Sequence, residues 1–176
     1  MPIGLYRGLA DRDVAAIVAY LRTVKAVRNT VAEPLYRIPL PTSYGPPVGS
    51  VPEPPRDDKV AYGAYLAGPL GHCIECHTPF VAGHPDFENR LGAGGFPFFE
   101  PWGTSVSANL TPDPESGLGK WTDQEIKTVI TTGIRPDGSR LLPPMAISYY
   151  ANIGAEELDA LVAYLRSLEP VRNVVR

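Results

Sequence analysis

Two cysteines, three residues apart and followed by a histidine, constrain this chain more than any other feature of its sequence. Cys73 and Cys76 are its only cysteines, and His77 follows them directly. This Cys-x-x-Cys-His spacing is the attachment signature of a c-type haem. Two thiols one helical turn apart can add to the two vinyl groups on one edge of a porphyrin, and the adjacent imidazole then reaches the iron. The motif predicts one covalently bound haem c, with Cys73 and Cys76 as anchors and His77 as an iron ligand.

Other uses of a cysteine pair fit this sequence less well. A zinc site needs further ligands, and the remaining histidines are His72 and His84. A redox pair of the thioredoxin type sits on a βαβ pattern, which is absent here. Two cysteines also exclude a fold stapled by several disulfides.

The haem iron needs a second axial ligand or an open position. Four side chains are candidates for that ligand: Met145, His72, His84 and Met1. Met145 follows the Pro143-Pro144 pair, which stiffens the backbone, and it lies in a loop that can cross the far face of the haem. His72 is too close to Cys73 to reach that face, and His84 is expected in an exposed loop. We therefore expect Met145 to be the second ligand.

Ligation on both sides of the iron favours electron transfer over substrate chemistry, because no coordination position is left for a substrate. The protein is therefore expected to be an electron carrier and not an enzyme. The alternative is a five-coordinate haem protein that binds a small ligand or a peroxide. An accessory subunit with a role in assembly is a third possibility.

Composition excludes some classes of function. A formal net charge of −3 argues against nucleic acid as the main partner. No apolar run approaches the roughly 20 residues that a transmembrane helix needs. The 20 prolines and 17 glycines predict long irregular loops and short helices.

Periodicity predicts four helices and no convincing strand, so the fold is expected to be mainly α. The helices are expected over residues 11–24, 59–66, 122–132 and 155–168. Asp57 and Asp58 are candidate caps for the second helix, and Thr122 and Glu125 form a capping-box pattern for the third. Gly133 stands where a glycine ends a helix.

The sequence also contains an internal repeat. Residues 1–29 align without gaps on residues 145–173, at an offset of 144, with 12 of 29 positions identical. Tyr-Leu-Arg and Val-Arg-Asn recur at the same distances from a methionine, which a shared helical pattern alone would not produce. The expected organisation is therefore the C-terminal part of a preceding unit (1–33), a proline-rich linker (34–56) and a complete haem unit (57–176).

Five segments extend the haem motif to a family resemblance. They are Cys73-Ile-Glu-Cys76-His77-Thr78, Ser107-Ala-Asn109-Leu-Thr-Pro-Asp113, Gly117-Leu-Gly119-Lys-Trp121-Thr122, Pro144-Met145 and Leu161-Val-Ala-Tyr164-Leu165-Arg166. With these segments, residues 57–173 resemble a class I cytochrome c domain. They are most similar to the repeated units in the multi-haem cytochrome c subunits of bacterial membrane-bound alcohol, aldehyde and gluconate dehydrogenases. The resemblance implies a small helical bundle around one covalent haem, here preceded by an extra N-terminal helix and the linker.

The resemblance also implies one-electron transfer within a complex, as part of a respiratory chain. A dehydrogenase subunit would be the donor, and an oxidase, a quinone-linked complex or another cytochrome the acceptor. The expected location is the periplasm or the outer face of the bacterial cytoplasmic membrane. The chain departs from this family in having a single haem motif and no signal-peptide pattern. We therefore expect that Met1 is not the natural start, and that it corresponds to Met145 as an axial ligand of a haem in a preceding unit. The alternative is a true single-haem protein with a vestigial N-terminal helix packed on its surface.

Three further side chains are candidate haem contacts. Trp121 can meet the haem edge or a propionate, Arg135 can neutralise a propionate, and Tyr150 can line the distal side. Asn109 is expected to hydrogen-bond loop backbone. Asp113 and Glu115 are expected to be solvated loop residues.

Overall fold

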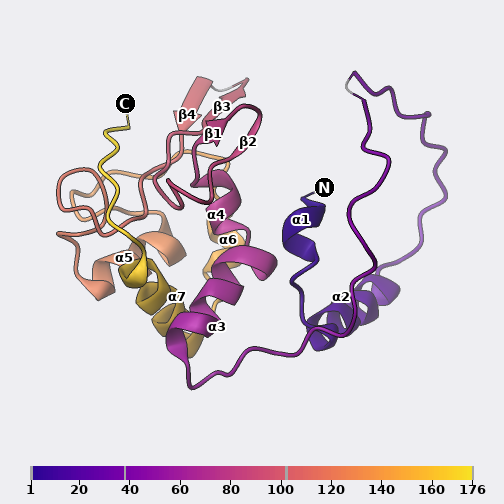
Figure 1. The fold of residues 1–176 in the computed structure, drawn as a ribbon, viewed down its shortest axis with the longest axis horizontal. Coiled ribbons are helices and arrows are strands. Elements are labelled where there is room, and N and C mark those ends of the chain that lie inside the picture. Colours follow the sequence, from indigo (N-terminus) through magenta and orange to yellow (C-terminus); the bar gives the residue numbers. More distant parts are fainter. Residues whose placement is uncertain (1, 38, 102, 176) are drawn as a thin grey trace. The chain divides into compact units, whose positions relative to one another are not determined.

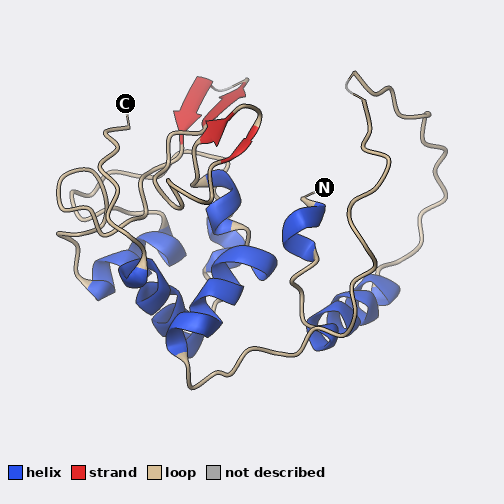
Figure 2. Ribbon diagram, viewed as in Figure 1, coloured by secondary structure: helices blue, strands red, loops and turns tan. Residues whose placement is uncertain are grey.

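The computed structural model describes residues 2–37, 39–101 and 103–175. The chain forms two compact units, Met1–Pro54 and Pro55–Arg176, each described here by itself (Figure 1). Helices predominate over strands (Figure 2), so the expectation of a mainly α fold is confirmed. Within the described ranges, no helix is long and apolar enough to cross a membrane.

The second unit is a set of short helices joined by long loops. In chain order they are α3 (Lys59–Tyr65), a π-helical turn η1 (Leu66–Leu70), α4 (Cys73–Cys76), α5 (Asp123–Thr132), α6 (Ile147–Tyr150) and α7 (Ala155–Ser167). The predicted helices therefore correspond to α3, α5 and α7 in this unit. The one-turn helices α4 and α6 escaped prediction because four residues show no periodicity.

The helix ends follow the sequence signals. Asp58 caps α3 by accepting a hydrogen bond from the Ala61 amide at 2.9 Å. Thr122 and Glu125 form the expected capping box at the start of α5, and Gly133 ends that helix with φ +70°. These local signals are reliable because each one satisfies backbone groups that the helix leaves unpaired.

Helices α3 and α7 pack closely against each other (Figure 1). Their backbones meet at Gly63, where a Cβ atom would lie 2.0 Å from the Ala160 carbonyl oxygen. Only glycine permits this approach. The contact fixes the two helices on which the rest of the unit is built.

The expectation of no strands is wrong for the described residues. Two small antiparallel sheets are present: β1 (Phe80–Val81) with β2 (His84–Pro85), and β3 (Pro97–Glu100) with β4 (Gly103–Val106) (Figure 2). These strands are too short for a period of two to be recognisable, and prolines stand in or beside them. They form because the loop reverses direction and pairs with itself.

The first unit contains α1 (Ile3–Tyr6) and α2 (Asp11–Thr23), the latter as predicted. The proline-rich stretch returns to the start of α2. Asp11 accepts hydrogen bonds from the Ser50 hydroxyl and the Val51 amide, and Arg12 pairs with Glu53 at 2.8 Å. Met1 lies outside the described residues, so the structure does not bear on its predicted role as a ligand.

Candidate functional site

One cavity of the second unit brings together the side chains that the haem motif and the proline-anchored loop predict as ligands. It is lined by Cys73, Cys76, His77 and Met145, and its volume is about 670 Å³. Cavities of this size hold cofactors and other small molecules. Met145 is distant in sequence from the other three residues, so its position on this wall depends on the folding of the whole unit.

The two cysteines lie in α4, at the ends of its single turn. Both are free thiols. Burial raises the pKa of the Cys73 thiol to about 11, and burial together with the Glu75 carboxylate raises the pKa of Cys76. Redox-active and metal-binding cysteines have lowered pKa values instead. Two half-buried thiols with raised pKa values beside an apolar cavity therefore fit thioether anchors better than a redox pair.

His77 is buried and held in one orientation. Its Nδ1 atom lies 2.7 Å from the Ala108 carbonyl oxygen, which can only accept, so Nδ1 carries the proton. Burial lowers the pKa of His77, although the bond to Ala108 opposes this effect. The ring is therefore neutral and keeps the Nε2 lone pair for a metal ion.

Neighbouring backbone reinforces the position of His77. The Gly94 amide donates to the His77 carbonyl oxygen at 2.8 Å. A Cβ atom at Gly94 would lie 2.4 Å from the Ala108 carbonyl group. Gly94 therefore lets the segment that carries the acceptor of the imidazole approach closely. The sequence does not identify Gly94 or Ala108 as site residues, although Ala108 lies within one of the segments that carry the family resemblance. Only the fold brings their backbone groups to His77.

Met145 lies in a loop that is fixed on both sides. The Ser105 hydroxyl of β4 donates to the Pro143 carbonyl oxygen at 2.7 Å. The Met145 carbonyl accepts from the Ile147 amide at the start of α6 at 3.0 Å. The loop is thus attached to a strand before Met145 and to a helix after it, and Met145 is half-buried on the cavity wall.

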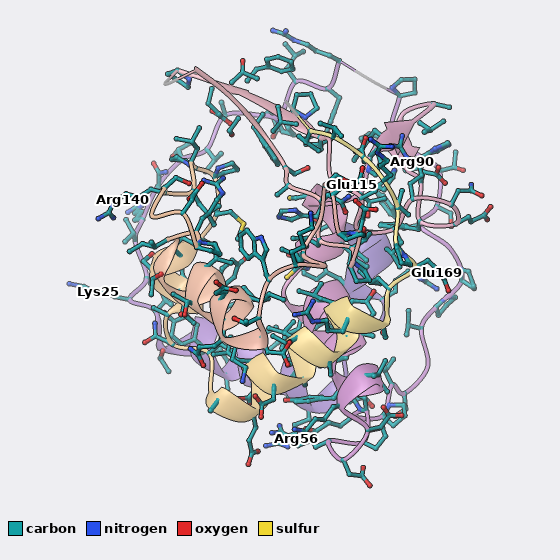
Figure 3. All side chains as sticks on the ribbon, turned by 90° about the vertical axis from the view of Figure 1, so that its left-hand side faces the viewer. Lys25, Arg56, Arg90, Glu115, Arg140 and Glu169 are labelled. Carbon is teal, nitrogen blue, oxygen red and sulfur yellow. The ribbon has the colours of Figure 1, made fainter. Side chains whose placement is uncertain are left out.

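The three further candidates, Trp121, Arg135 and Tyr150, also line this cavity. The guanidinium of Arg135 donates to the Ser139 hydroxyl at 3.1 Å and to the Arg140 carbonyl at 2.9 Å, which fixes it on its own loop. Arg140 itself is exposed and points away from the rest of its own unit (Figure 3). Burial raises the pKa of Tyr150.

The other two histidines differ in position. His72 lines the cavity beside Cys73, with its Nδ1 atom 3.1 Å from a Glu75 carboxylate oxygen. His84 is exposed, as expected, and its Nδ1 atom lies 2.9 Å from the Val81 carbonyl oxygen. Within the described ranges, no three His, Cys, Asp or Glu side chains converge as a metal site, so the zinc alternative lacks a ligand set there.

A network of polar side chains holds the loop that carries Ala108. Asn109 donates to the Val171 carbonyl oxygen at 2.7 Å and accepts from the Thr111 amide at 2.9 Å, as expected of a residue that binds loop backbone. From the C-terminal tail, Asn173 donates to the Ala93 carbonyl oxygen at 2.8 Å. No sequence pattern indicates that this tail contacts the site.

The expectation that Asp113 is solvated is wrong. The side chain is buried and accepts hydrogen bonds from the Glu115 amide, the Ser116 amide and the Ser116 hydroxyl. It closes a tight turn of the loop, because a carboxylate can accept from several donors at once. Glu115 is exposed, as expected, and pairs with Arg172.

This donor set fits a covalently bound haem. Two neutral thiols on one helical turn, a neutral imidazole with a free Nε2 and a thioether share one largely apolar cavity. That combination defines the site of a c-type cytochrome.

Comparison with known proteins gives the same class. The family model described as cytochrome c matches residues 60–169, and the chain belongs to this family. A nicotinate dehydrogenase subunit of Pseudomonas putida is 39% identical over 103 residues, which cover 58% of this chain and 8% of that protein. The alcohol dehydrogenase (quinone) cytochrome c subunit of Gluconacetobacter polyoxogenes is 38% identical over 113 residues, 64% of this chain and 22% of the relative.

A third relative matches almost the whole chain. The fructose dehydrogenase cytochrome subunit of Gluconobacter japonicus is 30% identical over 186 aligned positions, which cover 96% of this chain and 36% of that subunit. The chain therefore spans about a third or less of each of these three relatives. The proteins that it resembles are mainly cytochrome subunits of bacterial dehydrogenases.

Proposed function

We propose that this protein transfers single electrons through one haem c bound covalently in the second unit. Cys73 and Cys76 are the thioether anchors, and His77 and Met145 are the axial ligands. The observation that carries this assignment is the convergence of all four side chains on one cavity. The haem, when bound, supplies a one-electron couple at its iron.

The residues of the chain determine how that couple behaves. The bond from His77 to the Ala108 carbonyl fixes the ring and increases the basicity of Nε2. A thioether ligand at Met145 favours ferrous iron relative to a second imidazole. The midpoint potential is therefore expected to be higher than that of a bis-histidine haem. The chain itself catalyses no substrate reaction.

The cavity wall completes the proposed haem site. Trp121, Arg135 and Tyr150 are proposed to contact the porphyrin, in keeping with their places on this wall. The apolar side chains of α5 and α7 that line the cavity would keep water from the iron of a bound haem. A dry site keeps the reorganisation around a changing charge small, which suits electron transfer.

The relatives suggest where these electrons come from. We propose that the protein works in a complex, with a dehydrogenase subunit as donor. The acceptor would be another cytochrome, an oxidase or a quinone-linked complex. The proposed location is the periplasm or the outer face of the cytoplasmic membrane, because haem attachment to Cys-x-x-Cys-His takes place outside the cytoplasm.

Titration of the ferrous protein with carbon monoxide tests the ligand assignment. The native site is expected to bind the gas slowly or not at all at neutral pH, because Met145 occupies the sixth position. Met145→Ala opens that position and is expected to bind it rapidly and stoichiometrically. Rapid stoichiometric binding to the native site would instead establish the five-coordinate alternative, a ligand-binding or peroxide-binding haem protein.

Leu142→Ala is the matched control. Leu142 lines the same cavity from the same loop but carries no donor atom. This variant is expected to keep the carbon monoxide response of the native protein. A response like that of Met145→Ala would mean that loosening the loop, and not loss of the sulfur, opens the iron.

A further inference from the structure

The first unit repeats the end of the second unit element by element. Under the shift of 144 residues, the bounds of α1 coincide with those of α6, and the bounds of α2 coincide with those of α7. Four successive backbone hydrogen bonds, from the amides of residues 6–9, recur from the amides of residues 150–153 with the same partners. The repeat is therefore structural as well as sequential.

In the second unit, α7 uses two faces. Ala160 and Tyr164 meet α3 at Gly63. Leu161 and Leu165 line the cavity that contains His77. Helix α7 thus covers one helix of its core and closes the haem cavity at the same time.

Helix α2 has the same two faces, but its side chains are exposed. Ala16 and Tyr20 stand at the positions of Ala160 and Tyr164, with Tyr20 70% exposed where Tyr164 is 9% exposed. The cavity-facing positions differ in the same way. Ile17 is 43% exposed and its counterpart Leu161 is 5% exposed, while Leu21 is 60% exposed and its counterpart Leu165 is 5% exposed. The side chains suited to a core are present in α2 without the core.

The polar residues of the repeat follow the same rule. Arg166 donates to the Leu118 carbonyl at 3.0 Å and to the Asp123 carboxylate. These bonds attach the start of α5 and the loop before it to α7. Its counterpart, Arg22, is exposed, and the structure gives it no side-chain hydrogen bond to the described residues. Asn29, the counterpart of Asn173, is exposed as well. Among the described residues of the first unit, these donors therefore lack the acceptors that their counterparts have.

Within the described residues, the hydrogen bonds of the proline-rich stretch do not go to the two faces of α2 that carry Ala16, Ile17, Tyr20 and Leu21. Carbonyls of Tyr44 and Pro46 accept from Arg7, which follows α1. Ser50, Val51 and Glu53 of the stretch bind the first residues of α2, at Asp11 and Arg12. Another copy of this chain is also a poor occupant, because its α3 is already covered by its own α7. The likeness of α2 to α7 therefore favours a different core of the same kind as the occupant.

We infer that α2 docks on the haem-binding core of a second, different cytochrome c unit, as α7 docks on the core of its own unit. Ala16 and Tyr20 contact a glycine-bearing helix of that core. Ile17 and Leu21 close its haem cavity, and Arg22 donates to carbonyls of its loop. The inference rests on the proposed function in one respect, since it makes this second core the haem carrier with which the first exchanges electrons.

The match to the fructose dehydrogenase cytochrome subunit supports this partner. The alignment includes the first unit, and the chain corresponds to 36% of that longer subunit. By sequence position Met1 corresponds to Met145.

Photocrosslinking in the intact complex tests the docking surface. Tyr20 is replaced by benzoylphenylalanine in the full chain, produced in its native host, and the crosslinked peptides are identified by mass spectrometry. The expected product joins α2 to a core that carries its own Cys-x-x-Cys-His motif. A crosslink to α3 of this chain or of another copy, a crosslink to a protein without haem, or no crosslink would overturn the inference.

Two matched variants sharpen the experiment. The same probe at Thr23, whose counterpart Ser167 is exposed, is expected to give at least tenfold less product. Ala16→Glu places a charge at the helix crossing and is expected to lower the Tyr20 crosslink at least tenfold. Ala15→Asp introduces the residue that α7 has at position 159, and it is expected to leave the yield unchanged.

The carbon monoxide response of the same preparations separates the two hypotheses. It reports on the site at Cys73–His77, which belongs to the other unit. If the probe at Tyr20 gives no crosslink to a haem-bearing core while the ferrous protein still binds carbon monoxide slowly or not at all, the docking inference alone is overturned. If the expected crosslink forms but the ferrous protein binds carbon monoxide rapidly and stoichiometrically, the ligand assignment alone is overturned.

Discussion

At the scale of single residues, the site depends on backbone groups that approach His77. Its imidazole donates to the Ala108 carbonyl, and its own carbonyl accepts from the Gly94 amide. Both contacts come from the long loop after the haem motif. The orientation of the proposed iron ligand is therefore set by backbone groups of residues whose side chains are not reactive.

Gly94→Ala is expected to disrupt this arrangement. The residue has φ +70°, and a Cβ atom there would lie 2.4 Å from the Ala108 carbonyl group. The left-handed conformation alone costs a substituted residue about 1–2 kcal/mol, and the clash adds to it. We expect a loss of unfolding free energy of about 3 kcal/mol or more, with a shifted midpoint potential, measured by denaturant titration and potentiometry.

Gly138→Ala is the control for the backbone effect. Gly138 has φ +81°, and a Cβ atom there would meet nothing within 4 Å. This variant should lose only about 1–2 kcal/mol and keep the potential. Equal losses in the two variants would mean that the contact between Gly94 and Ala108 is unimportant.

Asp113 is expected to make stability depend on acid pH. Hydrogen bonds from the Ser116 hydroxyl and amide hold the pKa of Asp113 below its usual value. The folded state therefore gains stability from the carboxylate above the unfolded pKa of about 3.9, and loses it as pH falls through the lower folded value. Asp113→Asn should lower stability at pH 7 and weaken its decline below about pH 4, measured by urea unfolding at several pH values.

The comparison variant for this effect is Asp57→Asn. Asp57 is exposed and lies far from the turn in sequence. Its replacement should leave the pH profile as in the native protein. A profile that Asp113→Asn does not alter would show that the turn contributes nothing to acid sensitivity.

At the scale of elements, the crossing of α3 and α7 organises the second unit. Sequence periodicity predicts both helices, and the capping box at Thr122 predicts the start of α5. Periodicity does not reveal that the two helices cross at Gly63. From sequence alone, a glycine within a helical pattern could equally mean that the helix is unstable. The hairpins β1–β2 and β3–β4 were missed since pairing across a loop leaves no regular pattern in so few residues.

Gly63→Ala is expected to destabilise the unit although alanine is the better helix former. The intrinsic preference favours alanine by about 1 kcal/mol. The added methyl group would lie 2.0 Å from the Ala160 carbonyl oxygen, and overpacking of this kind costs about 1–3 kcal/mol or more. We expect a net loss of about 2 kcal/mol in chemical unfolding.

The control for this prediction is Val60→Ala, on the exposed side of α3. It should change stability by less than about 0.5 kcal/mol. A neutral or stabilising Gly63→Ala would contradict the close crossing.

At the scale of the whole molecule, the chain divides into two compact units. The hydrogen bonds that hold His77, Asn109 and Met145 all lie within Pro55–Arg176. The first unit supplies none of them. The haem site should therefore be complete without it.

A chain shortened to residues 55–176 is expected to bind one haem c with an unchanged midpoint potential. The haem content is measured against protein mass, and the potential by redox titration. A second truncation that ends at Leu168 removes Asn173 and the Val171 carbonyl, which hold the loop of Ala108. It should lower stability clearly. Loss of haem from the chain of residues 55–176 would show that the N-terminal unit belongs to this site.

The sequence by itself determined the chemistry of this protein. Thiols spaced at one helical turn, an adjacent imidazole and a proline-anchored methionine are covalent and local features, so they can be read without a fold. Tertiary structure decided what brings them together and what orients them. The contacts of Ala108, Gly94 and Asn173 join segments that are far apart along the chain, and no local pattern encodes a close approach of that kind.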